Sequence, residues 1–222
     1  MSSRERILGR VRRALADVPQ DDTPYDQAVA RDYVREHGDR SVEQTVELLA
    51  ENLADYRAIV HRCTADDLAV TLAGMLAARG AKTVLVPPGL EPSWLAEAEA
   101  DQVPDRSEST PHELDGIDSV VTACAVAIAE TGTIVLDGSP DQGRRRITLV
   151  PDHHICVVRV PEQVVSSVPQ GLERLDPARP LTWISGPSAT SDIELDRVEG
   201  VHGPRTLEVV LVGGRSSAEV DS

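Results

Sequence analysis

The order strand, helix, strand between residues 58 and 86 constrains the fold more than any other feature of the sequence. Ala58-Ile59-Val60 is typical of a short buried strand, and Thr83–Val86 of a second one. Apolar residues recur at helical spacing over 68–76, and Gly80 is a typical helix end. Strands joined by a helix in this way lie parallel in one sheet, so we expect an α/β fold.

The rest of the chain extends this expectation to a parallel-rich central sheet flanked by helices. Further helices are predicted at 4–16, 25–37, 41–54, 91–100, 161–167 and 169–175, and 101–116 is a polar stretch without a predicted element. Short runs rich in Val and Ile predict strands at 119–122, 125–129, 133–136, 147–150, 155–160, 181–184 and 207–212. We therefore expect an N-terminal helical appendage with its linker at 1–24, one domain at 25–213 and a flexible tail at 214–222.

Composition excludes several classes of function. The chain of 222 residues has a net charge of −15 and only 2% aromatic residues, which argues against a nucleic-acid-binding protein. No apolar stretch is long enough to span a membrane, and no secretory signal begins the sequence. The cysteines Cys63, Cys124 and Cys156 are too few and too scattered for an iron–sulfur cluster or a structural zinc site. Reduced thiols indicate a cytoplasmic protein.

The predicted N-terminal helix is basic in an otherwise acidic chain. Its polar positions carry Arg4, Arg6, Arg10, Arg12 and Arg13. The helix either docks on an acidic partner or a membrane surface, or simply presents a solvated face. The sequence favours the second interpretation.

The first candidate for chemistry is the string from Ala129 to Ile134, which joins two predicted strands. Glu130 is followed by Thr131, Gly132 and Thr133. Side chains at strand ends in α/β folds commonly face ligands, and glycine lets the backbone approach a ligand closely. The other interpretation is a tight turn with a solvated glutamate.

Two further candidates follow in the C-terminal part of the chain. The segment 185–194 is rich in hydroxyl side chains and resembles a helix start, where free N–H groups bind anions. The hexapeptide 200–205 is a rigid turn that presents His202 and Arg205, and arginine suits carboxylates and phosphates. The candidate anion-binding residues here are Ser185, Gly186, Ser188, Thr190, Asp192, Gly203 and Arg205.

Pro151-Asp152-His153-His154 raises the question of a metal site. Adjacent residues on a strand point to opposite faces, so His153 and His154 are poor joint ligands, and we expect no metal. The neighbouring run Arg144–Arg146 either neutralises nearby acids or forms a gate for an anionic ligand.

Four strings occur in a distinctive order: Ala-Glu-Thr-Gly-Thr-Ile (129–134), Leu-Val-Pro-Asp-His-His (149–154), Ser-Gly-Pro-Ser-Ala-Thr-Ser-Asp-Ile-Glu (185–194) and Gly-Val-His-Gly-Pro-Arg (200–205). On these strings the chain resembles the lactate utilization protein C family of the LUD-domain (formerly DUF162) group, over nearly its whole length. The resemblance implies a fold like that of the NagB/RpiA/CoA-transferase superfamily.

The resemblance also implies a function. The chain would be an accessory or substrate-handling subunit of a three-component system that oxidises L-lactate to pyruvate. The partners would be two cysteine-rich subunits with iron–sulfur clusters, while this chain holds no cofactor and takes a small anionic substrate. Glu130 or His202 would then be the group that accepts the hydroxyl proton.

Two alternatives stay open. The chain is a stand-alone enzyme for a CoA thioester or a phosphorylated small molecule, in which Glu130 is a nucleophile as in CoA-transferases. The glycine-rich partner loop of those enzymes is absent from the sequence, which weakens this alternative. The third interpretation is a signalling or stress protein that uses the same domain.

Overall fold

A computed structural model of the chain describes residues 2–18, 24, 27, 29, 34–190, 198–199 and 203–213. The chain forms two compact units, Met1–Val34 and Arg35–Ser222. In the first unit, helix α1 (Ser3–Ala14) begins with a capping box between Ser2 and Glu5. The predicted N-terminal helix is thereby confirmed, within two residues at each end.

The second unit is built on a six-stranded sheet, counted over the described residues. Its strands, in spatial order, are β1 (Ile59–Thr64), β12 (Thr206–Gly213), β7 (His153–Arg159), β4 (Ser119–Thr122), β2 (Thr83–Val86) and β3 (Asp101–Pro104). All neighbouring pairs in it are parallel. The prediction of an α/β fold with a parallel central sheet is confirmed.

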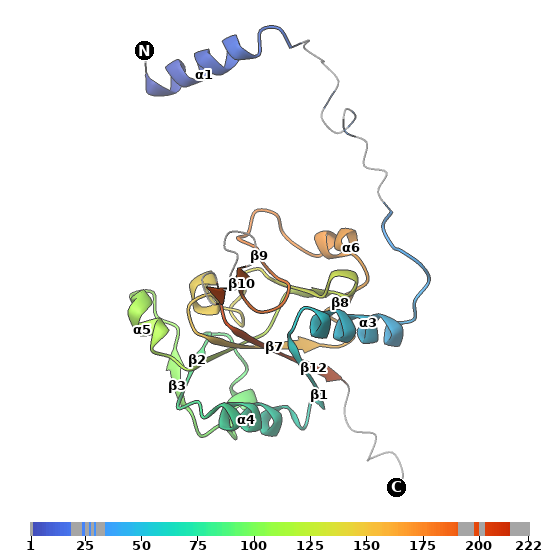
Figure 1. Ribbon diagram of the computed structural model, residues 1–222, viewed down its shortest axis with the longest axis vertical. Helices are drawn as coiled ribbons and strands as arrows, with labels where there is room; N and C mark the ends of the chain where they lie inside the picture. The colour runs from blue at the N-terminus through green and yellow to red at the C-terminus, as the bar shows by residue number, and fades with distance from the viewer. Residues whose placement is uncertain are drawn as a thin grey trace. The chain divides into compact units, whose positions relative to one another are not determined.

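Helix α4 (Leu68–Arg79) covers one face of this sheet, as Figure 1 shows. Leu72 and Leu76 of α4 pack with Val210 and Ile155 of the sheet, and Trp94 of the short 3-10 helix η1 (Pro92–Leu95) joins the same cluster. The connection β1–α4–β2 is the strand–helix–strand unit expected from the sequence.

A second sheet and helix α3 cover the opposite face. Within the described residues this sheet has four strands, in the order β8 (Val164–Val165), β5 (Val126–Ile128), β6 (Thr133–Leu136) and β9 (Thr182–Ile184). Leu49 and Leu53 of α3 (Val42–Asp55) pack with residues of both sheets. Helix α6 (Val168–Glu173) packs against β5 and β8. This face of the central sheet is where the candidate site lies.

Several predicted elements are wrong, each for a local reason. The helix expected at 91–100 is only the 3-10 turn η1, because the chain turns at 96–97 to enter strand β3 at Asp101. The strand expected at 147–150 is part of a 3-10 helix, η3 (Arg145–Thr148), whose Ile147 enters a small apolar cluster. The helix expected at 161–167 is a turn followed by the short strand β8.

Other elements fall where no element or a different one was expected. The polar stretch 101–116 contains both β3 and the short helix α5 (Pro111–Asp115). Most of the helix expected at 25–37 lies outside the described residues, among which Gln27 is helical and residues 34–37 are not. Strands β10 (Ala189–Thr190) and β11 (Val198–Glu199) form a two-stranded antiparallel pair. Over the described ranges, no helix is both long and apolar enough to cross a membrane.

Candidate functional site

The turn that carries Glu130 lies against helix α3. Residues Ala129–Thr131 form the 3-10 turn η2, which ends at Gly132 with a φ of 54°. Asn52 of α3 donates from Nδ2 to the carbonyl oxygen of Ala129 at 2.7 Å. A Cβ on Gly132 would lie 2.8 Å from backbone atoms of Asn52. Gly132 therefore lets α3 approach the turn.

The carboxylate of Glu130 is engaged by basic groups of the chain itself. Arg40 Nη1 donates to Oε1 at 3.2 Å, and His37 Nδ1 lies 3.1 Å from Oε2. The side chain of Glu130 is only 19% exposed. Its backbone N–H donates to the carbonyl oxygen of Ser166 at 3.0 Å. Glu130 is thus held in an ion pair with Arg40.

Three hydroxyl side chains connect this turn to the segment that follows β9. Thr131 Oγ1 donates to Thr133 Oγ1 at 2.8 Å, and Thr133 Oγ1 lies 2.8 Å from Ser185 Oγ. The pairing of β6 with β9, in which Ile134 lies opposite Ile184, brings Thr133 and Ser185 together. The two regions predicted as separate candidates therefore share one hydrogen-bonded network.

A cavity of about 130 Å³ lies beside that network, between the two sheets. The segment 185–188, Gly203 and Pro204 line one part of it, and His154, Thr148 and Leu207 line another. Ser188 N donates to the carbonyl oxygen of Pro204 at 2.8 Å, which ties the two predicted loops together.

Gly186 fixes the course of the segment 185–188. Its φ is 82°, and a Cβ there would lie 2.2 Å from the carbonyl oxygen of Tyr56. Only glycine meets both conditions, since other residues rarely adopt a positive φ and would clash with Tyr56. Gly186 therefore positions the cavity wall through its backbone.

His154 is a polar residue in this cavity that the sequence did not single out as a site residue. Its side chain is fully buried, and its Nε2 lies 2.8 Å from Thr122 Oγ1. Its Nδ1 is buried without a hydrogen-bond partner in the part of the chain that the structure describes. Burial, and then the nearby His153, lower the pKa of His154 to about 3. The imidazole is therefore neutral at physiological pH.

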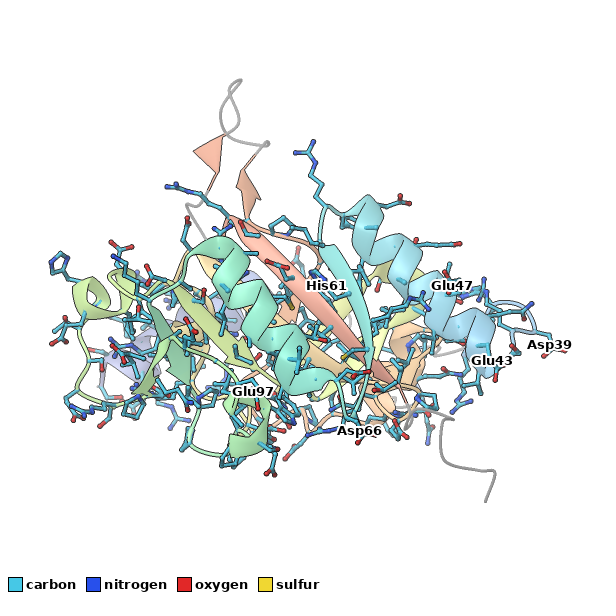
Figure 2. The ribbon with its side chains drawn as sticks, turned by 90° about the horizontal axis from the view of Figure 1, so that it is seen from below. Asp39, Glu43, Glu47, His61, Asp66 and Glu97 are labelled. Atoms are coloured by element: carbon cyan, nitrogen blue, oxygen red, sulfur yellow. The ribbon has the colours of Figure 1, made fainter. Side chains whose placement is uncertain are left out.

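The adjacent His153 belongs to the other face of the sheet, as strand alternation predicts. It lies 2.7 Å from Ser119 Oγ through Nδ1 and 3.0 Å from Glu208 Oε1 through Nε2. Glu208 Oε2 in turn lies 2.6 Å from His61 Nε2. The hydrogen bond with His153 holds the pKa of Glu208 below its ordinary value. Figure 2 shows His61 on β1, beside α4.

The remaining predicted residues divide into three groups. Arg205 Nε lies 3.4 Å from Asp152 Oδ1, both side chains are more than half exposed, and neither residue lines the cavity. His202 and Asp192 lie outside the described residues. Thr190 is placed through its backbone only, in β10.

Another feature of the described part of the chain is the placement of its possible metal ligands and its cysteines. The described residues contain no group of three His, Cys, Asp or Glu side chains that would hold a metal ion. A hydrogen bond with Cys156, together with burial, holds the pKa of Cys124 well above its ordinary value, and burial raises that of Cys63. Cys124 and Cys63 therefore carry their thiol protons at neutral pH.

Known proteins resemble this chain in sequence. The LUD domain profile matches residues 46–212. Lactate utilization protein C of Deinococcus radiodurans is 48% identical over 167 residues, which span 73% of this chain and 77% of that protein. Lactate utilization protein C of Bacillus subtilis is 33% identical over 122 residues, which span 50% of this chain and 49% of that protein.

A solved structure agrees with these sequence matches. The crystal structure of a DUF162 family protein from Deinococcus radiodurans aligns with a TM-score of 0.69 and 40% identity, over 79% of this chain and all of that chain. The parallel sheet, the second sheet and the cavity between them lie within the matched region. The chain therefore belongs to the LUD-domain family.

Proposed function

We propose that this chain takes part in lactate utilization, as the substrate-handling subunit of a three-component system that oxidises L-lactate to pyruvate in the cytoplasm. The names of the relatives from Deinococcus radiodurans and Bacillus subtilis support the role in lactate utilization. The observation that carries the substrate-handling part is the cavity of about 130 Å³ beside Ser185 and His154. The buried His154 is part of its lining, and its volume suits a small molecule.

The proposed division of labour rests on the chemistry of the cysteines. Oxidation of lactate releases two electrons, which need a redox group to carry them. Cys124 and Cys156 are buried, and Cys63 lies apart from them on β1. We therefore assign the electron-carrying iron–sulfur clusters to two cysteine-rich partner subunits.

The pairing of Glu130 argues against the alternative enzyme with a covalent glutamyl intermediate. A nucleophilic carboxylate must reach its substrate, whereas Glu130 is bound by Arg40 and His37 and does not line the cavity. In this proposal Glu130 instead fixes the segment before α3 on the turn at 129–132.

The proposal is tested by growth on L-lactate. A strain that lacks the gene is given back a variant of this chain in which a larger side chain fills the cavity. Leu149 lines the cavity and is 36% exposed, so Leu149→Trp fills the cavity from its rim. Leu172 is 52% exposed on α6 and lines none of the cavity, so Leu172→Trp is the matched control. We expect Leu172→Trp to restore growth of the deletion strain and Leu149→Trp to fail, at equal protein levels.

Two results would contradict the proposal. One is normal growth of the deletion strain on L-lactate when no second copy of the gene is present. The other is full rescue by Leu149→Trp. Purification of the tagged wild-type chain from lactate-grown cells tests the partners separately, and we expect two cysteine-rich iron–sulfur proteins and lactate-dependent dye reduction in the eluate.

A further inference from the structure

We propose that His154 and Arg145 together select the ligand of this cavity, a small monoanion with a hydroxyl or carbonyl oxygen next to its carboxylate. This inference rests on the proposed function, because it names the ligand chemistry of the same site. It assigns roles to His154, at the end of the string 149–154, and to Arg145, in the arginine run before that string.

The first step of the argument concerns His154 Nδ1. A neutral imidazole has one donor and one acceptor nitrogen, and Thr122 Oγ1 already engages Nε2 at 2.8 Å. Whichever tautomer is present, Nδ1 therefore has one hydrogen bond to offer. As an acceptor it suits a ligand hydroxyl, and as a donor it suits a ligand carbonyl. A buried polar atom without a partner is unfavourable, so a ligand oxygen that fills this role gains affinity.

The second step concerns size. The cavity of about 130 Å³ is much smaller than pockets for drug-sized ligands, which begin at about 300 Å³. An apolar cavity of about 150 Å³ holds benzene, which has about six non-hydrogen atoms. Lactate and pyruvate have the same number of non-hydrogen atoms. The cavity therefore suits a three-carbon acid.

The third step concerns charge. Among three consecutive arginines, Arg144 is paired with Asp105, and Arg146 donates to the carbonyl oxygen of Ser109. Arg145 donates only to neutral oxygens, from Nε to Thr182 Oγ1 at 3.1 Å and from Nη2 to the Leu181 carbonyl at 2.6 Å. Over the described residues, no carboxylate lies within ion-pair distance of Arg145, so its charge is available to an anion.

The fourth step places that charge beside the cavity. Arg145 lines a neighbouring hollow of about 220 Å³, which shares Thr148 and Thr182 with the cavity. A ligand whose hydroxyl or carbonyl oxygen binds His154 can direct its carboxylate across this shared wall toward Arg145. His154 would bind the hydroxyl or carbonyl oxygen, and Arg145 would attract the carboxylate. Together they would select acids that carry an oxygen on the carbon next to the carboxylate.

Binding measurements on the full-length protein test this inference with four probes. L-lactate and pyruvate have both a carboxylate and an oxygen on the carbon next to it. Propionate lacks that oxygen, and L-lactamide lacks the negative charge. We expect lactate or pyruvate to bind about tenfold or more tightly than propionate and lactamide in calorimetry. With ¹⁵N-labelled histidine, we expect the bound acid to shift the Nδ1 resonance of His154.

Substitutions then separate the two contributions. Arg145→Gln should weaken binding of the acid by about tenfold or more and lactamide binding much less. Arg146→Gln, on a neighbour that lines neither cavity, is the matched control and should bind like wild type. His154→Gln retains a group near Nε2 but loses Nδ1, and should reduce the preference for lactate over propionate. His154→Asn retains a group near Nδ1 and should preserve more of that preference.

Three results would overturn the inference: equal affinities for lactate and propionate, equal effects of Arg145→Gln and Arg146→Gln, or no shift of the His154 resonance with any probe. The last result would mean that the cavity holds water only. A chain that supports growth on lactate but fails these binding tests would overturn this inference alone. A chain that passes them but is dispensable for growth would overturn the proposed function alone.

Discussion

At the scale of single residues, the account depends on which face of β7 each of two adjacent histidines occupies. His153 lies on the α4 face and is hydrogen-bonded through both nitrogens, whereas His154 faces the second sheet with one nitrogen unpaired. The sequence predicts that the two residues diverge, because strand residues alternate. It does not predict which of them meets a cavity, because that depends on how the second sheet packs.

The low pKa of His154 predicts a specific dependence of stability on pH. Its folded-state pKa of about 3 lies below the ordinary value of 6.5, so the unfolded chain binds a proton that the folded chain does not. The stability contribution is therefore complete above pH 6.5 and is lost as the pH falls toward 3. As the pH falls from about 7.5 to 5.5, protonation of this histidine in the unfolded chain should lower the free energy of unfolding by about 1 kcal/mol.

Urea denaturation at several pH values measures this effect. The variant His154→Gln should lose this part of the decline, whatever its stability at neutral pH. His112 is exposed on α5, and His112→Gln is the matched control, which should keep the wild-type slope. A His154→Gln variant with the wild-type slope would show that His154 does not remain neutral in the folded protein.

At the scale of elements, close packing of α3 against the turn at 129–132 holds the site in place. Asn52 and Leu53 of α3 contact the turn where Gly132 has no side chain. The sequence pattern left two reasons open for a glycine at this position, the approach of a ligand and a tight turn. The structure shows a helix instead, and a glycine in a strand–turn string is compatible with either neighbour.

Gly132→Ala should therefore destabilise the protein. The added Cβ would meet backbone atoms of Asn52 at 2.8 Å, and alanine is strained at a φ of 54°. We expect a loss of about 2 kcal/mol or more in the free energy of unfolding. Gly74 lies in α4 with no atom within 4 Å of the added Cβ, so Gly74→Ala should be neutral or slightly stabilising. Equal stabilities of the two variants would contradict this account of the turn.

At the scale of the whole molecule, the sequence predicts the central sheet better than the layer above it. Each parallel strand except β3 contains a short apolar run, which is a local property of the sequence, whereas the polar β3 (Asp101–Pro104) is not predicted. The second sheet is built from strands as short as Val164–Val165, which form only because β5 lies beside them. Such pairing is not encoded in a local pattern, so residues 161–167 resembled a helix.

In the candidate site, too, a local sequence pattern predicts some features, and others depend on how the chain packs. The structure brings Thr133 close to Ser185, and Ser188 close to Pro204, because these residues of the strings flank strands that lie near one another in the fold. His154 lies in the string 149–154, and Arg145 lies in the arginine run that the sequence offered as a gate for an anion, but nothing in the sequence pairs the two residues. In the described part of the chain, His154 Nδ1 lacks a hydrogen-bond partner and Arg145 lacks a carboxylate partner. Such partners are determined by the folded chain and not by a local sequence pattern.

The most direct test of the central claim is a crystal structure of the full-length protein grown with pyruvate, at a resolution that distinguishes water from an organic acid. We predict a ligand in the cavity with an oxygen at hydrogen-bond distance from His154 Nδ1 and its carboxylate toward Arg145. A cavity that is empty or holds only water, while His154 Nδ1 bonds to another residue of the chain, would contradict the account.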